Sequence, residues 1–302
     1  MNTKSVWKAH AALFLVNTLY GASHILAKGV MPNYLTPSVF ILFRGVGAVL
    51  LFWSVLFFSK VIKIEKQDLF RFILCGFFGV ALNQLCFFHG LNLSSSINSG
   101  IIMALNPIVV VFLSFIFLKE RISFLRILGV LLGASGACLL TLNGIKINTS
   151  AAFGDLLLLI NCISFAFYLV LAKPLMKKYS PLTVITYVFS FGLVFVLLYP
   201  PTLSELLITD FVQIPLHAWF KIAYVVIGVT FITYLLTLYG LKHLSASTSS
   251  SYIYTQPIMV IVFTYLFVYL GFSADYTDSI TMEKLIYMLL IFSGVYLTGK
   301  EG

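Results

Sequence analysis

The chain has 302 residues, of which 60% are hydrophobic and 10% charged, and its mean hydropathy is +1.03. A water-soluble fold cannot hide that much apolar surface, so the composition predicts an all-α integral membrane protein whose main partner is the lipid bilayer. The Lys and Arg residues behind the formal charge of +9 lie in short loops rather than on one face, so they do not indicate nucleic acid as a partner.

Ten apolar runs are long enough to cross a bilayer. We expect spans at residues 8–29, 37–59, 69–90, 94–118, 123–142, 152–172, 181–200, 218–240, 245–270 and 284–299. With a cytoplasmic amino terminus, the inner loops collect fourteen of the 19 Lys and Arg residues, the outer side holds four, and Arg44 lies within the second span. This distribution follows the positive-inside rule and predicts that orientation.

Cofactors and metals are not expected. All four cysteines (Cys75, Cys86, Cys138 and Cys162) fall inside apolar runs, and no two have the spacing of metal ligands. They are interpreted as small core residues, without a disulfide framework or a zinc site. No nucleophile, metal cluster or carboxylate pair appears at membrane depth, so no catalytic residue is predicted and an enzyme is not expected.

Polar side chains follow one face of the first span, where Asn17, Tyr20, His24 and Lys28 recur every three or four residues. Lipid offers no hydrogen-bond partner, so this stripe faces protein or water. We favour a substrate cavity for Asn17, Tyr20 and His24 as a set, with interhelical hydrogen bonding as the alternative for each alone. For Lys28 we expect the ammonium group to reach the outer surface.

Arg44 lies about two turns into the second span, roughly 10 Å below its outer end. Two interpretations stay open: Arg44 binds a substrate carboxylate or phosphate, or it binds carbonyl groups at helix ends. No Asp or Glu falls in the middle of a span. A carboxylate proton relay is therefore not supported, and facilitated movement or exchange is the expected mode.

Amide, phenol and hydroxyl groups recur on other spans and predict a polar, aromatic chamber suited to zwitterionic or mildly polar organic solutes. For any one residue, simple packing is an equal alternative. The candidates beyond the first span and Arg44 are Asn83, Gln84, Asn98, Asn106, Asn161, Tyr168, Thr233, Tyr234, Tyr252 and Gln256, with Ser249 on the same stripe as the last two.

A long segment of the chain occurs twice. Residues 93–121 and 244–270 each place a Ser-rich turn before an apolar run with a central proline, Pro107 or Pro257, preceded by an amide, Asn106 or Gln256. Proline kinks a helix and frees a carbonyl, which in hydrocarbon needs a protein or water partner. Two proline breaks at matching positions, one in each half of the chain, therefore indicate a polar cavity at mid-membrane.

The repeat extends beyond the proline spans. Gly90-Leu91 matches Gly240-Leu241 at the same 150-residue offset as the prolines, Leu26-Ala27-Lys28 matches residues 171–173, and Pro37 matches Pro181. Five spans in each half, an odd number, make the second half enter the membrane in the opposite sense. The sequence thus predicts two inverted repeats meeting at a central site.

This paired pattern, together with the turn Lys119-Glu120-Arg121-Ile122-Ser123 after the first copy, resembles the EamA-type members of the drug/metabolite transporter superfamily over essentially the whole chain. The resemblance implies ten transmembrane helices, cytoplasmic termini, and repeats at residues 1–146 and 147–302 around a substrate cavity. The second copy departs from the family pattern, with Gly271-Phe272-Ser273 in place of a charged turn.

We therefore hypothesise a transporter of the inner (cytoplasmic) cell membrane that works by alternating access, with Gly90, Pro107, Gly240 and Pro257 shaping the moving helices. The resemblance suggests export or exchange of amino acids or related small molecules. Efflux of amphipathic drugs, and exchange of phosphorylated metabolites or nucleotide sugars, are the alternatives.

Two surface features remain. Gly129, Gly133 and Gly136 form a stripe that permits close helix approach, either within the chain or in a homodimer. Between spans seven and eight, Leu203, Leu206, Leu207 and Phe211 have helical spacing and predict a short amphipathic element on the outer surface.

Overall fold

The computed structural model describes residues 3–58, 64–94, 99, 102–103, 105–119, 123–142, 149–270, 286, 289–290, 292–294 and 296–297. These residues form helices and turns, without a strand. The α-helices are α1 (Thr3–Lys28), α2 (Pro37–Phe57), α3 (Lys66–Gly76), α4 (Leu82–Leu93), α6 (Asn106–Leu113), α7 (Phe124–Leu142), α8 (Thr149–Lys178), α9 (Pro181–Leu198), α10 (Pro200–Ile208), α11 (Leu216–Tyr224), α12 (Thr233–His243), α13 (Ala246–Ser251) and α14 (Gln256–Tyr269). Three π-helical segments, η1 (Phe77–Ala81), η2 (Ser114–Leu118) and η4 (Val225–Ile232), and two 3-10 segments, η3 (Phe211–Gln213) and η5 (Tyr252–Thr255), complete the set.

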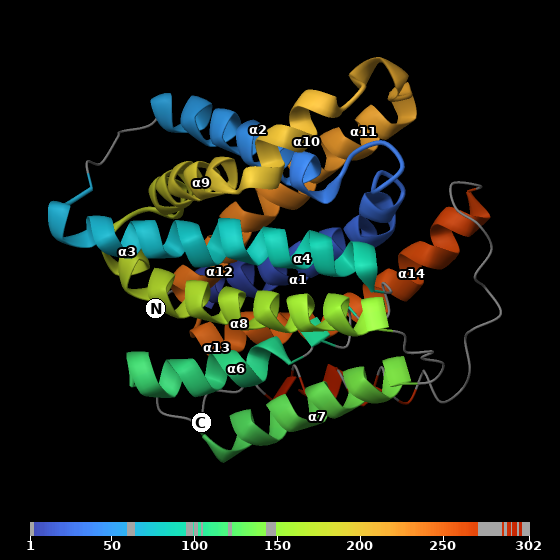
Figure 1. The fold of residues 1–302 in the computed structure, drawn as a ribbon. Coiled ribbons are helices and arrows are strands. Elements are labelled where there is room, and N and C mark those ends of the chain that lie inside the picture. The colour runs from blue at the N-terminus through green and yellow to red at the C-terminus, as the bar shows by residue number, and fades with distance from the viewer. Residues whose placement is uncertain are drawn as a thin grey trace.

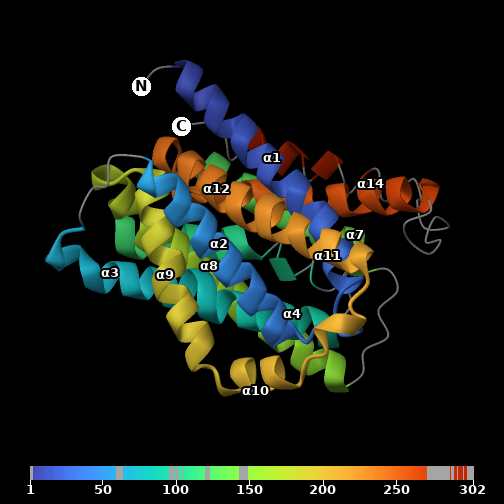
Figure 2. The ribbon, with the colours of Figure 1, turned by 90° about the horizontal axis from the view of Figure 1, so that it is seen from above.

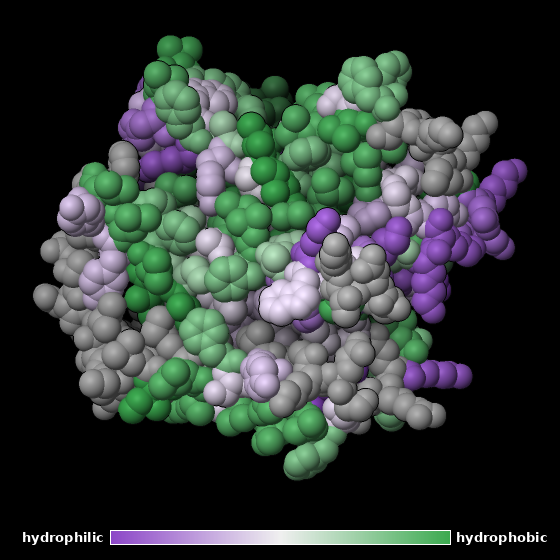
Figure 3. Space-filling model, turned by 180° about the vertical axis from the view of Figure 1, so that it is seen from behind, coloured by the Kyte–Doolittle hydropathy of each residue, from purple (hydrophilic) through white to green (hydrophobic). Residues whose placement is uncertain are grey.

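The all-helical prediction is confirmed for these residues. Within the described part of the chain, five helical stretches are long and apolar enough to cross a membrane: Pro37–Phe57, Lys66–Leu93, Ala152–Lys178, Pro181–Leu198 and Leu216–His243. Asn106–Leu118 and Phe124–Gly136 are shorter apolar helices. Figure 3 shows a face on which hydrophobic residues predominate, with hydrophilic residues gathered toward its edges. Large apolar side chains such as Phe57, Phe112 and Phe124 lie on the outside, as expected where lipid is the solvent.

Matching caps begin the second helix of each half. Thr36 Oγ1 accepts a hydrogen bond from the backbone N–H of Val39, and Ser180 Oγ accepts one from that of Thr183. Pro37 and Pro181 follow these caps in the first helical turn, where the missing N–H is not needed. The two prolines matched in the sequence therefore have the same structural role.

The two halves are crossed. Helix α4 lies along α8, and α1 lies along α12 (Figure 1 and Figure 2). Gly90 on α4 faces Leu158 on α8, and its counterpart Gly240 on α12 faces Leu13 on α1. Leu13 and Leu158 are themselves counterparts, because the first helices of the two halves match at an offset of 145 residues. The same contact is thus made twice, each time between the first helix of one half and the third helix of the other.

The second helices of the two halves, α2 and α9, pack directly on each other. The rings of Phe52 and Phe189 lie 5.4 Å apart, and Trp53 Nε1 donates to Ser190 Oγ at 2.9 Å. Gly45, earlier in α2, faces Leu193, later in α9, so the two helices run antiparallel. If a two-fold axis relates these two antiparallel helices, that axis runs perpendicular to the helices and not parallel to them.

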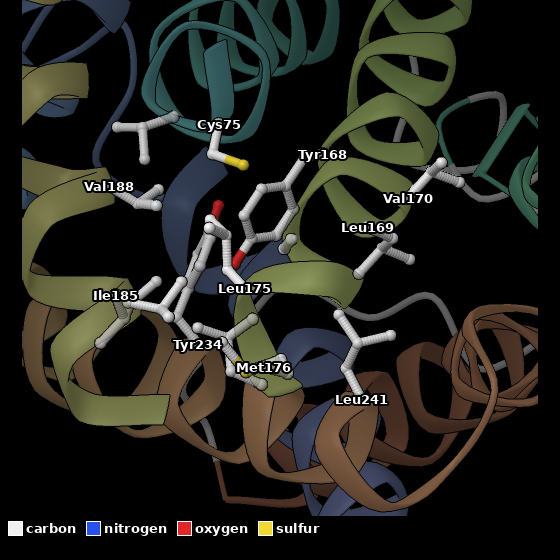
Figure 4. Close-up of a cluster of buried hydrophobic side chains, with 14 of the residues drawn as sticks. Cys75, Tyr168, Leu169, Val170, Leu175, Met176, Ile185, Val188, Tyr234 and Leu241 are labelled. Carbon is white, nitrogen blue, oxygen red and sulfur yellow. The ribbon is translucent and has the colours of Figure 1, made fainter. Parts of the chain in front are cut away.

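A buried cluster of side chains joins helices of the two halves (Figure 4). Tyr168 and Tyr234 lie at its centre with ring centroids 6.4 Å apart, surrounded by aliphatic side chains including Ile185 and Val188 of α9. Tyr168 packs against Gly79, where a side chain would collide with the ring. The cluster therefore couples α3, η1, α8, α9 and α12.

An ionic seam joins α3 to the end of α8. Lys178 Nζ lies 2.9 Å from Asp68 Oδ2 and 3.4 Å from Glu65 Oε2. The hydroxyl of Tyr179 also donates to Asp68 Oδ2, at 2.8 Å, and accepts from the backbone N–H of Glu65. Because the Asp68 carboxylate has two donors and little exposure, this seam holds the two halves together more firmly than an exposed ion pair would.

The glycine stripe of α7 is used inside the chain. A side chain at Gly133 would collide with the ring of Tyr254, and Gly294 packs against the backbone of Gly129 and Gly133. The hydroxyl of Tyr254 also donates to the carbonyl of Val130 at 3.0 Å. Of the two interpretations left open by the sequence, the structure supports internal packing for this part of the stripe.

The predicted amphipathic element between spans seven and eight contains α10, but its apolar residues do not share one role. Leu206 and Phe211 pack against the buried cluster around α2 and α11, whereas Leu207 is 85% exposed. The helix ends at Ile208, and Asp210 caps the next turn by accepting from the N–H of Val212. Because the helix ends before Phe211, the four apolar residues do not form the single helical face that their spacing predicted.

The crossed contact provides a first prediction. A Cβ atom at position 90 would lie 2.8 Å from the carbonyl oxygen of Gly154, a backbone atom that cannot swing aside. We expect Gly90→Ala to lower the free energy of unfolding by about 1–3 kcal/mol. In the control Gly228→Ala, the nearest atom, in the Tyr224 ring, is 3.5 Å away, so little change is expected. Thermal unfolding in detergent measures both, and equal effects would contradict the prediction.

Candidate functional site

A cavity of about 90 Å³ lies where the halves cross, among α1, α2, α4, α8, η4 and α12 and the start of α14. This volume admits several water molecules. Nine of the predicted cavity residues line it: Asn17, Tyr20, His24, Arg44, Asn83, Gln84, Asn161, Tyr234 and Gln256. The other lining residues are Leu13, Val16, Ser23, Phe87, Phe88, Met103, Phe165, Leu169, Val229, Thr237, Ser249 and Ile253.

The remaining predicted residues lie elsewhere. Asn106 and Thr233 are fully buried beside the cavity, and Tyr168 belongs to the cluster of Figure 4. The hydroxyl of Tyr252 pairs with His10 Nδ1 at 2.5 Å, away from the lining. Asn98 falls outside the described residues.

The amides that precede the two prolines make matching hydrogen bonds. Gln256 Nε2 donates to Asn17 Oδ1 at 2.8 Å, and Asn106 Nδ2 donates to the carbonyl of Cys162 at 3.0 Å. Asn106 is the counterpart of Gln256, and Cys162 is the counterpart of Asn17, so each broken helix is tied to the first helix of the other half. Pro107 and Pro257 each stand in the first turn of the helix that follows, α6 and α14.

Gln84 and Tyr234, 150 residues apart, are counterparts that touch each other. Gln84 Nε2 approaches the Tyr234 hydroxyl at 3.5 Å, and that hydroxyl donates to the carbonyl of Gly79 at 3.3 Å. Residues that contact their own counterparts lie on the axis relating the halves. The axis therefore passes through the cavity lining.

Side chains donate hydrogen bonds to backbone carbonyls in and just after the widened turn of η1. Ser164 Oγ donates to the carbonyl of Phe78 at 2.6 Å, and Asn161 Nδ2 donates to that of Asn83 at 2.7 Å. A π-helical turn leaves carbonyls without regular helical partners, and inside a membrane those partners must come from the protein. The second half has η4 at the counterpart position, where Thr230 Oγ1 donates to the carbonyl of Val225 at 2.8 Å.

Arg44 is 3% exposed. Its Nε donates to Thr230 Oγ1 at 2.9 Å, and its Cζ lies 4.6 Å from the centre of the Phe88 ring. Because the Thr230 proton is already used by Val225, Thr230 acts purely as the acceptor for Arg44. The guanidinium is thereby fixed at the cavity wall by one hydrogen bond and one aromatic face.

His24 lies on α1, toward the opposite end of the polar stripe from Asn17. Its Nδ1 lies 3.3 Å from Ser99 Oγ, and its ring meets Phe87 edge to face at 5.5 Å. Among the described residues, no group of three His, Cys, Asp or Glu side chains is placed to hold a metal ion. The wall thus combines amides, phenols, one imidazole and one guanidinium.

Comparison with known proteins decides the family. The EamA-like transporter family matches residues 7–142 and 152–299. The chain belongs to the EamA-like transporter family. EamA proteins of this kind are multi-pass membrane transporters, and the family assignment indicates a transporter rather than an enzyme.

Individual relatives agree with this assignment. The chain is 27% identical to the uncharacterized transporter YyaM of Bacillus subtilis over 81% of each chain. It is also 27% identical to a probable terminal-alkyne amino-acid exporter of Streptantibioticus cattleyicolor, over 68% of this chain and 67% of that one. A protein of known crystal structure, 18% identical, shares the fold with a TM-score of 0.72 over 98% of both chains.

Sequence reasoning missed the apolar part of the lining. Phe87 and Phe88 lie one turn after Asn83 and Gln84 on α4, a spacing that indicates a shared face. Phe165 and Ile253 likewise follow Asn161 and Ser249 by four residues. Met103 could not be assigned from the sequence, because an apolar side chain in a membrane helix fits lipid as well as a cavity.

The proline-linked amides provide a second prediction. Gln256→Leu leaves the buried Asn17 Oδ1 without its donor, and we expect a loss of about 1–3 kcal/mol in unfolding free energy. The double variant Asn17→Leu/Gln256→Leu is expected to lose less than the sum of the single variants. Gln213→Leu, at an exposed glutamine, is the control, with an effect within about 0.5 kcal/mol. Additive losses in the double-mutant cycle would contradict a direct coupling.

Proposed function

We propose that this EamA family member moves small organic metabolites, foremost amino acids or related compounds, across the cell membrane by alternating access around the central cavity. The observation that carries the proposal is the position of the cavity. Its walls come from both halves, so a rocking motion of one half against the other would open it first to one side and then to the other.

The proposed topology has ten spans in two inverted repeats, residues 1–146 and 147–302, with cytoplasmic termini in the inner membrane. The antiparallel packing of α2 on α9 supports inversion, because the axis relating them crosses the helices. The contacts of Gly90 with Leu158 and of Gly240 with Leu13 are suitable pivots, since each brings two helices close together. Pro107 and Pro257 would let the adjoining helices bend independently.

Several lining features support amino acids or related solutes. Amide, hydroxyl and guanidinium groups lie on the same wall as aromatic rings, as recognition of a small polar molecule with an apolar part requires. The name of the Streptantibioticus cattleyicolor relative, a probable amino-acid exporter, points the same way. Efflux of amphipathic compounds is the second candidate, favoured by Phe87, Met103, Phe165 and Ile253 in the lining. Phosphorylated metabolites have less support, because Arg44 is the single Arg or Lys among the described lining residues.

Transport into proteoliposomes tests the proposal. Purified protein is reconstituted, and the uptake of labelled amino acids is followed with unlabelled solute trapped inside. We expect protein-dependent uptake of at least one amino acid, reduced about tenfold or more by Ser249→Phe, which places a ring in the cavity. Ser135→Phe, at an exposed position of α7, is the matched control and should leave uptake unchanged. No protein-dependent uptake, or equal uptake by both variants, would count against transport through this cavity.

A further inference from the structure

Arg44 is a buried cation that has no carboxylate partner among the described residues. Among the described residues lining the cavity, none is Asp or Glu. The ion pairs in the described part of the chain both belong to Lys178, at the α3 seam. An Arg side chain this deeply buried ordinarily has an anion beside it, because a desolvated charge without one is costly.

The surroundings of Arg44 hold it in place without neutralising it. Thr230 Oγ1 and the Phe88 ring engage Nε and one face of the guanidinium. Neither provides a negative charge, and the described residues form no hydrogen bond with the two terminal nitrogens. Two parallel N–H donors on a planar group match the two oxygens of a carboxylate. Arg44 is thus oriented as a receptor for an anion within the cavity.

Another part of the same lining provides a place for an apolar group. Phe87, Met103, Phe165 and Ile253 pack together around Cys162 and line the cavity. In the same lining, Gln84 Oε1 is buried without a hydrogen-bond partner among the described residues, so an acceptor is available for an N–H or O–H group. The cavity therefore has a cationic part, a neutral acceptor and an apolar part.

We propose that Arg44 binds a carboxylate of the transported solute, so that the cavity selects compounds with a carboxylate head and an apolar tail over their neutral amides and over cations without an acid group. This inference deepens the proposed function and rests on it, because it assigns the specificity of the same cavity. Arg44 is the one Arg or Lys among the described lining residues, which fits a single carboxylate better than a phosphate, because a phosphate usually gathers several positive groups.

Binding of matched acid and amide pairs tests the proposal. Affinities in detergent are measured for propionate, 3-methylbutyrate and 3-phenylpropionate, for the amide of each, for 3-phenylpropylammonium and for inorganic phosphate. In the unaltered protein, we expect at least one acid to bind about tenfold or more tightly than its amide, and tighter than the ammonium compound or phosphate. In Arg44→Gln, the preference for the acid should vanish while the amide still binds, and this retained binding shows that the variant is folded.

Two further variants sharpen the comparison. Arg71→Gln removes an exposed guanidinium on α3 and should keep the preference for the acid. Thr230→Val removes the acceptor that orients Nε but leaves the charge, so the preference should fall a few-fold without vanishing. If Arg44→Gln fails to fold, Thr230→Val with its graded loss provides the decisive comparison.

The results separate this inference from the proposed function. Equal binding of acid and amide, tighter binding of the ammonium compound or of phosphate, no binding of any acid, or an unchanged preference in Arg44→Gln would each overturn the role of Arg44. Uptake of amino acids by proteoliposomes with no acid preference would leave transport standing and reject the carboxylate site. An Arg44-dependent acid preference in a protein that moves no solute would support the site and reject the transport proposal.

Discussion

The first helix of each half packs against the third helix of the other half, and the rest of the structure depends on this crossed contact. At both crossings a glycine faces a leucine, Gly90 with Leu158 and Gly240 with Leu13. Without a side chain at the glycine, the backbones approach closely, which is the main source of helix association where lipid removes the hydrophobic driving force. Because each crossing joins the two halves, the space between the crossings belongs to both.

Hydrogen bonding inside the membrane follows from that arrangement. The proline breaks and π-helical turns release backbone groups that hydrocarbon cannot satisfy. At η1 a side chain from the crossing helix α8 supplies a partner, because Ser164 donates to the carbonyl of Phe78. Asn106, at a proline break, in turn donates to the carbonyl of Cys162 on α8. Gln256, at the other proline break, donates to Asn17 Oδ1 on α1. The polar residues near the cavity are therefore divided between those that hold the irregular backbone and those that remain open to a solute.

Much of this architecture could be predicted from the sequence. The paired prolines, the preceding amides and the nearly constant offset indicated a two-fold arrangement, and the polar stripe of α1 indicated one wall of the cavity. Tyr168 was expected to line the cavity with Asn161 on α8, but its ring packs against Gly79 in the core, whereas Asn161 lines the cavity. Periodicity identifies a polar face, and it does not say whether that face meets solute or another helix.

Other features gave no signal in the sequence. The π-helical turns η1 and η4 lie at counterpart positions, and no residue type marks them in the sequence. An apolar lining residue such as Met103 could not be distinguished from a residue that faces lipid, because both surroundings favour the same side chains. The α7 glycines permitted packing either within the chain or against another molecule. The structure shows the ring of Tyr254 against Gly133, a contact that the sequence did not indicate.

Accessibility of the cavity from the two sides of the membrane tests the central claim most directly. A single cysteine at Asn161, in a protein without its four native cysteines, is exposed to a membrane-impermeant thiol reagent in vesicles of each orientation. Both halves contribute walls, and the proposed transport cycle rocks these walls about the crossings, so the account predicts labelling from either side and protection by a bound solute. Labelling from one side alone under every condition, or from neither, would contradict alternating access through this cavity.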